Sequence, residues 1–289
     1  MSGMKRRIFD NGITTISYCP AGEAVSATVV VAFTEMGPVD VDRPGFGEMF
    51  LNKRGYDVIS VQKRKENWYQ DLSIDDLKQA VSEIVPRYKA VVTYGSSMGG
   101  YAALYFASAV GARALSFSPR NHAYYALVGM QRYADQFDTN HLPLQDVADP
   151  DRDHLILVDP LQPIDGPYVL QEVIPSFPKS RILNLRYTDH PSTFVLAHGG
   201  VLQNFVVDFL EGRPIDERML RRSRGKSPQY LHTLAKACFK KGRAATAMAL
   251  CQRALSIRAD HKDTLALLDR MTAKSARQEQ PSADALAPA

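Results

Sequence analysis

The sequence predicts an α/β protein with a mostly parallel, eight-stranded sheet, helices on both of its faces and a small helical extension. Three observations predict it. Short β-rich apolar runs alternate with helical stretches over roughly the first 212 residues. One such run ends in the turn Gly95-Ser-Ser-Met-Gly99, and a helix of small residues follows. From Ser227 the composition changes to helical sequence. A chain of 289 residues, 45% hydrophobic, is long enough for one large core and an appendage.

Individual elements follow from local patterns. Asn11-Gly12 separates two short apolar runs, which is typical of a tight hairpin. The uninterrupted apolar run at 27–33 predicts a buried parallel strand. Ser73 and Asp76 form a capping-box pattern that starts a helix, and Pro86 ends it. Further strands are predicted over 6–9, 13–18, 56–61, 90–94, 112–117, 155–158 and 181–187, helices around 49–51, 101–107, 167–174 and 200–210, and a helix with an irregular insertion over 121–150.

The turn at Gly95–Gly99 has the form G-x-S-x-G between a predicted strand and a predicted helix. Such a turn is so tight that Ser97 takes a strained backbone, and side chains at Gly95 or Gly99 would collide with their neighbours. It raises the Ser97 hydroxyl at the carboxyl edge of the sheet, where the next helix points its N–H groups at a developing oxyanion. Together with the element order, this motif resembles the α/β-hydrolase fold over about residues 4–212. The resemblance implies that Ser97 is a nucleophile.

A serine hydroxyl is a weak nucleophile, so Ser97 requires a base and an acid that orients the base. In hydrolases of the resembled fold the chain order is Ser, acid, His. Of the two histidines after the last predicted strand, His190 is preferred over His198, since His190 lies directly beyond that strand. For the acid, Asp159 is favoured because it ends a strand. Asp165 stays open as the alternative, although its position before a helix is also typical of an N-cap.

The resemblance also implies two backbone N–H donors that would stabilise an oxyanion. One belongs to Met98, the residue after the nucleophile. The second lies in the loop after the strand at 27–33, around Thr34, Glu35 or Met36. This loop has Thr-Glu-Met-Gly where many lipases and esterases have His-Gly-Gly-Gly, which argues against a typical lipase.

Aromatic side chains are candidates for lining a substrate pocket, because their faces suit sugar rings and acyl chains. They are Trp68, Tyr69, Tyr124 and Tyr125, with core packing as the alternative for at least half of them. The insertion within 121–150 is short and poor in Leu and Phe, which argues against a large apolar lid.

The C-terminal part resembles one tetratricopeptide repeat followed by a capping helix. Leu231, Ala247 and Ala254 occupy apolar positions of that repeat, and Gly242 makes the turn between two antiparallel helices. One helix pair cannot bury its own apolar face, so we expect it to contact the main domain, a protein partner or its own copy. The predicted division is a hydrolase domain at 1–215, a basic linker at 216–227, tetratricopeptide-like helices at 228–272 and a disordered tail at 273–289.

Composition limits the remaining functions. The net charge of +4 is too small to argue for a nucleic-acid partner. The basic clusters at 5–7, 63–65 and 221–226 are interpreted as solvated faces or linkers, with a site for an anionic substrate or surface as the alternative. Three cysteines give no disulfide framework. With no secretory signal and no apolar run near the ~20 residues of a membrane span, a cytoplasmic protein is expected. The sequence has neither a metal-ligand cluster nor a phosphate-binding glycine loop, so no metal or cofactor is expected.

These features predict a serine hydrolase of the carboxylesterase or acyl hydrolase type that acts through an acyl-enzyme on a small-molecule or glycan ester. The joined hydrolase and helix-pair domains resemble accessory proteins of bacterial polysaccharide and surface-glycan systems, which implies an acylated glycan. Two alternatives stay open. One is an acyltransferase that uses the same triad. The other is a catalytically inactive scaffold that binds a partner through residues 228–272.

Overall fold

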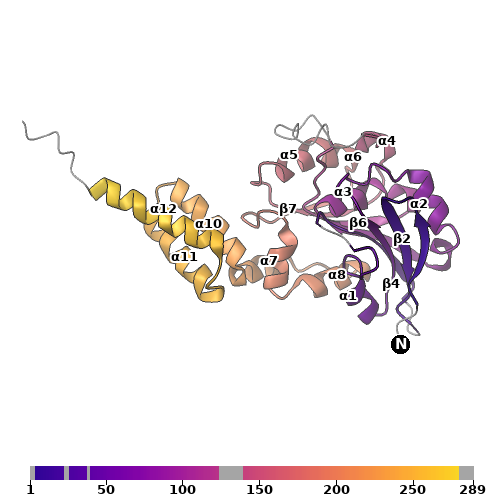
Figure 1. Cartoon of the computed structure of the whole chain (residues 1–289), viewed down its shortest axis with the longest axis horizontal. Coiled ribbons are helices and arrows are strands. Elements are labelled where there is room, and N and C mark those ends of the chain that lie inside the picture. Colours follow the sequence, from indigo (N-terminus) through magenta and orange to yellow (C-terminus); the bar gives the residue numbers. More distant parts are fainter. Residues whose placement is uncertain (1–3, 23–25, 38–39, 124–138, 280–289) are drawn as a thin grey trace, which may run out of the picture. The chain divides into compact units, whose positions relative to one another are not determined.

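In the computed structural model of the chain, the described residues are 4–22, 26–37, 40–123 and 139–279. They form two compact units (Figure 1). The main unit comprises residues up to 186 together with 190–193 and 202–215, and the helical unit comprises 187–189, 194–201 and the residues from 216 onward.

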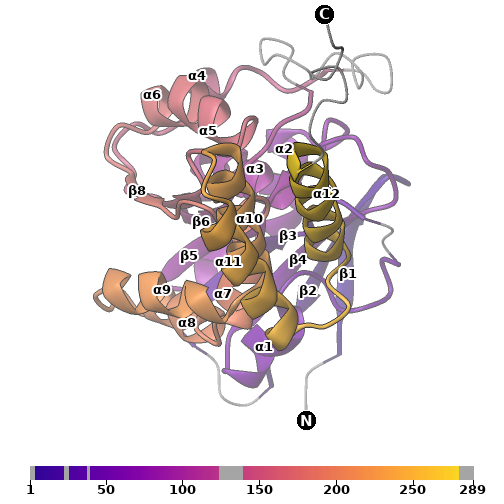
Figure 2. The same cartoon turned by 90° about the vertical axis from the view of Figure 1, so that its left-hand side faces the viewer.

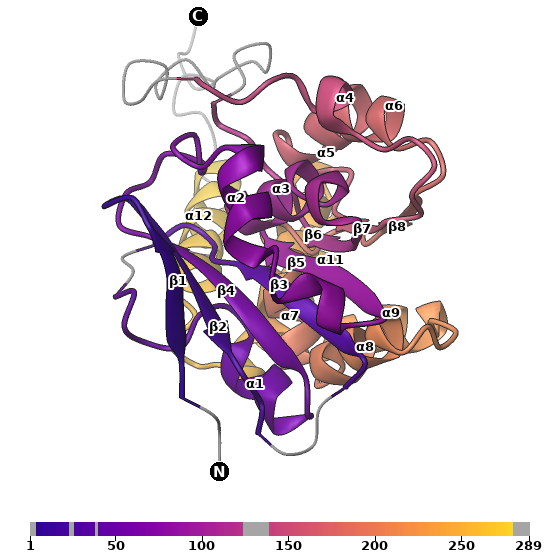
Figure 3. The same cartoon turned by 90° about the vertical axis from the view of Figure 1, so that its right-hand side faces the viewer.

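An eight-stranded sheet in the order β1-β2-β4-β3-β5-β6-β7-β8 forms the centre of the main unit (Figure 3). Its strands are β1 (Arg6–Asp10), β2 (Thr14–Cys19), β3 (Thr28–Phe33), β4 (Asp57–Lys63), β5 (Ala90–Ser96), β6 (Arg113–Phe117), β7 (Leu155–Val158) and β8 (Arg181–Asn184). β2 pairs antiparallel with both β1 and β4, and the other neighbouring pairs are parallel. Parallel neighbours need long crossover connections, which the intervening helices supply. The predicted fold class is confirmed.

Helices cover both faces of this sheet. α2 (Ile74–Val81) and α3 (Met98–Tyr105) lie on one face, and α1 (Glu48–Lys53) and α8 (Leu202–Leu210) on the other (Figure 3). The shorter helical turns of the main unit are η1 (Val85–Arg87), η2 (Ser108–Val110), α4 (Leu144–Val147), α5 (Asp165–Tyr168), η4 (Val169–Val173) and α6 (Ile174–Ser176). Although distant in sequence, α4 and α6 lie side by side (Figures 2 and 3). Because the helices lie over the two faces of the sheet, the carboxyl ends of the parallel strands are followed by loops.

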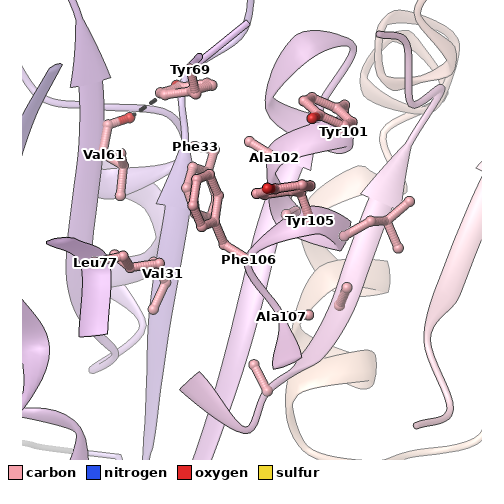
Figure 4. Close-up of a cluster of buried hydrophobic side chains, with 14 of the residues drawn as sticks. Val31, Phe33, Val61, Tyr69, Leu77, Tyr101, Ala102, Tyr105, Phe106 and Ala107 are labelled. Atoms are coloured by element: carbon pink, nitrogen blue, oxygen red, sulfur yellow. Dashed lines mark hydrogen bonds between the residues drawn. The ribbon is translucent and has the colours of Figure 1, made fainter. Parts of the chain in front are cut away.

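The main core lies between the sheet and the helices α2 and α3 that cover one of its faces (Figure 4). Phe33 on β3 stacks on Phe106 with ring centroids 5.5 Å apart and meets Tyr69 edge-on at 5.6 Å. The Tyr69 hydroxyl donates to the carbonyl of Val61 at 3.2 Å, so its polar end is satisfied within the core. Central parallel strands are buried on both sides, which explains their continuous apolar runs.

Two of the four aromatic pocket candidates belong to this core. Trp68 is 2% exposed and Tyr69 fully buried. Tyr124 and Tyr125 lie outside the described residues. Trp68 and Tyr69 are therefore packing residues, as the alternative interpretation held.

The helical unit contains more regular structure than its sequence predicted. Its elements are α9 (Glu217–Ser223), η5 (Arg224–Lys226), α10 (Pro228–Lys240), α11 (Ala244–Ile257) and α12 (Lys262–Glu279), together with most of α7 (Ser192–His198), a helix that sequence patterns missed. The segment expected to be a basic linker is thus helical, because the Asp216 side chain accepts the Met219 N–H at 3.0 Å and caps α9. Residues 273–279, assigned to the tail, continue α12 since Ala, Lys, Arg, Gln and Glu favour helix.

α10 and α11 pack side by side, with α12 against them (Figure 1). Gly242 has φ +76° in the turn between α10 and α11, a conformation that favours glycine. Ala235 and Ala247 are fully buried, so the first two helices approach closely, and Leu267 and Met271 cover them from α12. The resemblance to a tetratricopeptide repeat stays a prediction.

In the described part of the chain, no single helix is long and apolar enough to cross a bilayer. α7 and α8 satisfy that length and hydropathy only when they are counted together.

His154 provides a test of the main unit's packing through pH. Its ring is 1% exposed, and its Nδ1 accepts the Ala114 N–H at 2.9 Å. Burial lowers the pKa of His154 to about 4, from 6.5. The unfolded chain therefore binds more protons between these values, so this contribution to stability is complete above pH 6.5 and is lost as the pH falls toward 4.

We predict that His154→Asn, whose amide oxygen still accepts the Ala114 N–H but does not titrate, flattens this dependence. Between neutral pH and about pH 4.5 the free energy of unfolding of the wild type should fall by about 2 kcal/mol more than that of the variant. Urea unfolding at both pH values measures the difference. Equal losses in the two proteins would contradict the assigned burial.

Candidate active site

Ser97 occupies a sharp turn between β5 and α3. Its backbone has φ +58° and ψ −119°, outside the regions that residues with side chains usually adopt. A Cβ on Gly95 would lie 2.1 Å from the carbonyl oxygen of Gly99, and one on Gly99 would lie 2.3 Å from that of Phe33. Both are backbone collisions, so the two glycines are needed for β5, α3 and β3 to approach this closely.

The Ser97 hydroxyl is hydrogen-bonded to a histidine, which in turn is hydrogen-bonded to a buried carboxylate. Ser97 Oγ lies 2.7 Å from His190 Nε2, and His190 Nδ1 lies 2.7 Å from Asp165 Oδ2. Asp165 is fully buried, and the His190 side chain is 16% exposed. Because a carboxylate accepts from Nδ1–H, Nε2 is left as the acceptor for the serine proton. Three residues from three separate segments therefore form one hydrogen-bonded chain.

Buried hydroxyls fix the segment that carries His190. Ser118, at the end of β6, accepts the Ser192 N–H at 3.0 Å and donates to the Ser192 hydroxyl at 3.1 Å. Ser96 and Thr193 share a hydroxyl contact at 3.3 Å. These contacts tie the chain just after His190 to the ends of β5 and β6, the strands beside the turn that holds Ser97.

Of the two carboxylates that the sequence left open, Asp165 is the one that contacts His190. The Gln162 side chain explains why Asp165 contacts His190 instead of capping α5. Its Oε1 accepts the N–H groups of Ile164 and Asp165 at 2.7 and 2.9 Å, which are among the first free donors of α5. Asp159, the favoured candidate, instead accepts the Leu161 N–H at 3.0 Å within the turn after β7.

Arg120 is a site residue that sequence reasoning missed. Its guanidinium contacts Asp165 Oδ1 through Nε at 2.8 Å and Nη2 at 2.7 Å, and its backbone N–H donates to the Ser97 carbonyl at 3.2 Å. The Arg120 side chain is 14% exposed. A signal did exist, since Arg120 follows β6, and the carboxyl ends of neighbouring parallel strands meet at one edge of the sheet.

The loop after β3 contains the other predicted N–H donors. The Thr34 N–H donates to the Val61 carbonyl at 3.1 Å, so it is occupied in sheet pairing and is a poor candidate for an oxyanion donor. The Tyr69 hydroxyl donates to the Thr34 carbonyl at 2.8 Å and holds the start of this loop. Met98 is the first residue of α3, where an amide N–H has no partner within its own helix. Met98, Glu35 and Met36 therefore stay as candidate donors.

Lys63 supports the same loop and corrects its interpretation as part of a solvated face. Its side chain is 1% exposed and pairs with Glu66 at 3.1 Å. Glu66 also accepts the Gly37 N–H at 2.6 Å, and Lys63 donates to the Gly37 carbonyl at 3.4 Å. Burial lowers the pKa of Lys63, and the neighbouring Glu66 opposes that shift. The buried Lys63 and the partly exposed Glu66 thus bind both backbone groups of Gly37.

Glu35 places a carboxyl group at the same site. Burial raises the pKa of Glu35, while a hydrogen bond from Ser96 and the proximity of His190 act in the opposite direction. His198, the less favoured histidine, is the exposed last residue of α7 and belongs to the helical unit. Across the described ranges, no group of three or more His, Cys, Asp or Glu side chains is arranged to hold a metal ion.

A cavity of about 170 Å³ lies in the main unit, with Tyr101, Asn121 and His141 in its wall. Tyr101 follows Ser97 by one helical turn, and its N–H donates to the Ser97 carbonyl at 3.0 Å. The Tyr101 hydroxyl lies 2.7 Å from His141 Nδ1, and the His141 Nε2–H donates a hydrogen bond to the Leu72 carbonyl at 3.0 Å. Burial lowers the pKa of His141 to about 4, so this part of the wall is polar and uncharged at neutral pH.

Comparison with known proteins supports the fold. The Uncharacterised protein family (UPF0227) matches residues 49–153, the stretch that contains Ser97 and Arg120. No curated protein sequence matches the chain. Among solved structures, an esterase from Pyrococcus furiosus is 17% identical with a TM-score of 0.50, over 73% of this chain and 90% of that one. A sugar hydrolase from Lactococcus lactis is 11% identical with a TM-score of 0.50, over 76% and 100%. The likeness shows an α/β-hydrolase-type fold.

The glycine contacts around Ser97 make a prediction about stability. Gly99→Ala should lower the free energy of unfolding by about 3 kcal/mol or more, because its Cβ meets the backbone of β3, which cannot yield as a side chain can. Gly212→Ala is the control, since nothing lies within 4 Å of its Cβ and only its φ of +67° opposes the change. That variant should lose about 1 kcal/mol. Urea unfolding measures both, and equal losses would refute the close approach.

Proposed function

We propose that the protein is a serine hydrolase of the esterase type. The observation that carries the proposal is the hydrogen-bonded chain from Ser97 through His190 to Asp165, in which both hydrogen bonds measure 2.7 Å. Nucleophile, base and orienting acid in this geometry are what acyl transfer to a serine requires. The names of two proteins with a similar fold, an esterase and a sugar hydrolase, agree with it.

In the proposed reaction, Ser97 Oγ forms a bond to the ester carbonyl carbon, and its proton moves to His190 Nε2. The carbon–oxygen bond to the alcohol then breaks, and His190 gives the proton to the leaving oxygen. Water attacks the acyl-enzyme with the same proton transfers and restores the Ser97 hydroxyl. Asp165 accepts the hydrogen bond from Nδ1–H, which keeps the proton of the neutral ring on Nδ1, and it stabilises the imidazolium that forms.

The oxyanion of each tetrahedral intermediate would accept the Met98 N–H and one N–H from Glu35 or Met36. Thr34 is the weaker candidate for that donor because its N–H donates to the Val61 carbonyl. One such donor is commonly worth about 3 kcal/mol in the transition state, so the support that Lys63 gives to this loop matters to the rate.

The proposed substrate is an ester of a small, hydroxyl-rich molecule, such as an acylated sugar. The cavity of about 170 Å³ next to α3 is comparable to the roughly 150 Å³ of a cavity that holds benzene, which is too small for a long acyl chain. The amide side chains of Gln70 and Asn121 in its wall can hydrogen-bond to hydroxyl groups of such a molecule.

A fluorophosphonate probe tests the nucleophile. The wild type should be labelled at about one probe per chain, Ser97→Ala should not be labelled, and Ser96→Ala, which removes the neighbouring hydroxyl that contacts Thr193, should keep at least part of the labelling. Intact-mass spectrometry gives the stoichiometry, and circular dichroism confirms that each variant is folded. A folded wild type that remains unlabelled would refute the proposal.

The acid is tested by a matched pair of amide substitutions. Asp165→Asn removes the charge that orients and stabilises His190, so kcat on a p-nitrophenyl ester should fall by roughly a thousandfold or more. Asp159→Asn keeps an oxygen for the Leu161 N–H and should change kcat less than about threefold. If Asp159→Asn gave the larger loss, the assignment of Asp165 would be wrong.

A further inference from the structure

The ionised side chains are distributed unequally along the chain. Residues 1–215 contain 20 Lys and Arg against 24 Asp and Glu, a net charge of −4, whereas residues 216–289 contain 15 against 7, a net charge of +8. The overall charge of +4 conceals this difference. A charge asymmetry of this size within one chain indicates that the basic part meets an anionic ligand or surface.

In the helical unit, three of these cations surround one hollow. Arg218 and Arg222 on α9 and Lys226 in η5 line this hollow, which has a volume of about 540 Å³. Gly199 contributes to its wall, and a Cβ there would lie 2.8 Å from the Cβ of Ser223. The chain at Gly199 thus approaches α9 closely, so the cations stand around a concavity formed by two segments.

The basic side chains of α9 differ in their pairing. Arg221 binds Glu217, one helical turn earlier, at 3.0 Å. Arg218 and Arg222, also one helical turn apart, are both exposed. Neither makes an ion pair with any described residue. Asp216 is the carboxylate at the hollow, and one of its oxygens accepts the Met219 N–H as the cap of α9. Positive charge is therefore left in excess on the side of α9 that lines the hollow.

A further cation lies close to η5. Arg253 on α11 donates from Nη2 to the carbonyl of Gly225 at 3.2 Å, next to Lys226 in sequence. The Arg224 guanidinium lies over the Tyr230 ring, 5.0 Å from its centroid. The positive surface therefore extends beyond the hollow over η5 and α11.

We propose that this hollow binds a phosphate group. Guanidinium groups present two parallel N–H donors that match phosphate oxygens, and a lysine adds a compact charge. Three cations against one carboxylate favour a ligand with at least two negative charges, which is a phosphomonoester or a diphosphate. The group belongs either to a soluble molecule or to a lipid headgroup. This site is separate from Ser97 and does not depend on the proposed esterase activity.

Titration calorimetry of the full-length protein with pyrophosphate, at constant ionic strength, tests the proposal. The wild type should bind about one pyrophosphate per chain. R218Q/R222Q should bind it at least about tenfold more weakly, because two charge-assisted contacts are lost. K240Q/K241Q removes the same charge from exposed positions at the end of α10 that do not line the hollow, and should bind within about threefold of the wild type. Lys226→Gln gives an independent loss should the double variant prove unstable.

Sedimentation with vesicles separates the two sources of phosphate. If vesicles containing phosphatidic acid sediment the wild type but not R218Q/R222Q, and pyrophosphate releases it, the ligand is a lipid headgroup. If pyrophosphate binds but vesicles do not, the ligand is a soluble phosphate compound. Either result supports the site. It is overturned if the wild type does not bind pyrophosphate, or if R218Q/R222Q and K240Q/K241Q weaken binding equally, which would indicate only a diffuse positive field.

Discussion

The fully buried carboxylate of Asp165 is the constraint on which the geometry of the site depends. An ionised group in the interior is unfavourable unless charges and hydrogen bonds surround it, and losing one partner of a buried pair commonly costs about 3–5 kcal/mol. Asp165 has two such partners on different oxygens, Arg120 on Oδ1 and His190 on Oδ2. Satisfying this carboxylate therefore holds the imidazole in place and directs its second nitrogen to Ser97.

Other polar groups near the site are also buried with a partner. Groups that would be costly to bury alone are paired in ways that fix loops: Ser118 with Ser192 behind His190, and Lys63 with Glu66 beside the loop after β3. A buried polar group with a single satisfactory arrangement defines the position of its loop more sharply than apolar packing does. The segment after His190 and the loop after β3 are thus each held by such a contact.

The parts that sequence predicted correctly are those that local rules determine. The succession of strands and helices along the chain, the cap at Ser73 and the glycines around Ser97 depend on residues a few positions apart. The contact of His190 with Asp165 rather than with Asp159 could not be predicted this way. Because Gln162 caps α5, Asp165 is available to His190, and that outcome depends on one side-chain rotamer. The position of Arg120 after β6 places it at the carboxyl edge of the sheet, but its contact with Asp165, 45 residues away, does not follow from local patterns.

The central claim is that Ser97 becomes acylated. The most direct measurement is rapid mixing with p-nitrophenyl acetate, followed by an acid quench and peptide mass spectrometry. A burst of about one p-nitrophenol per chain, with one acetyl group on the peptide that contains Ser97 and on Ser97 itself, is the predicted result. Turnover without an acetylated peptide under the same conditions, or acetylation at a different residue, would contradict the account.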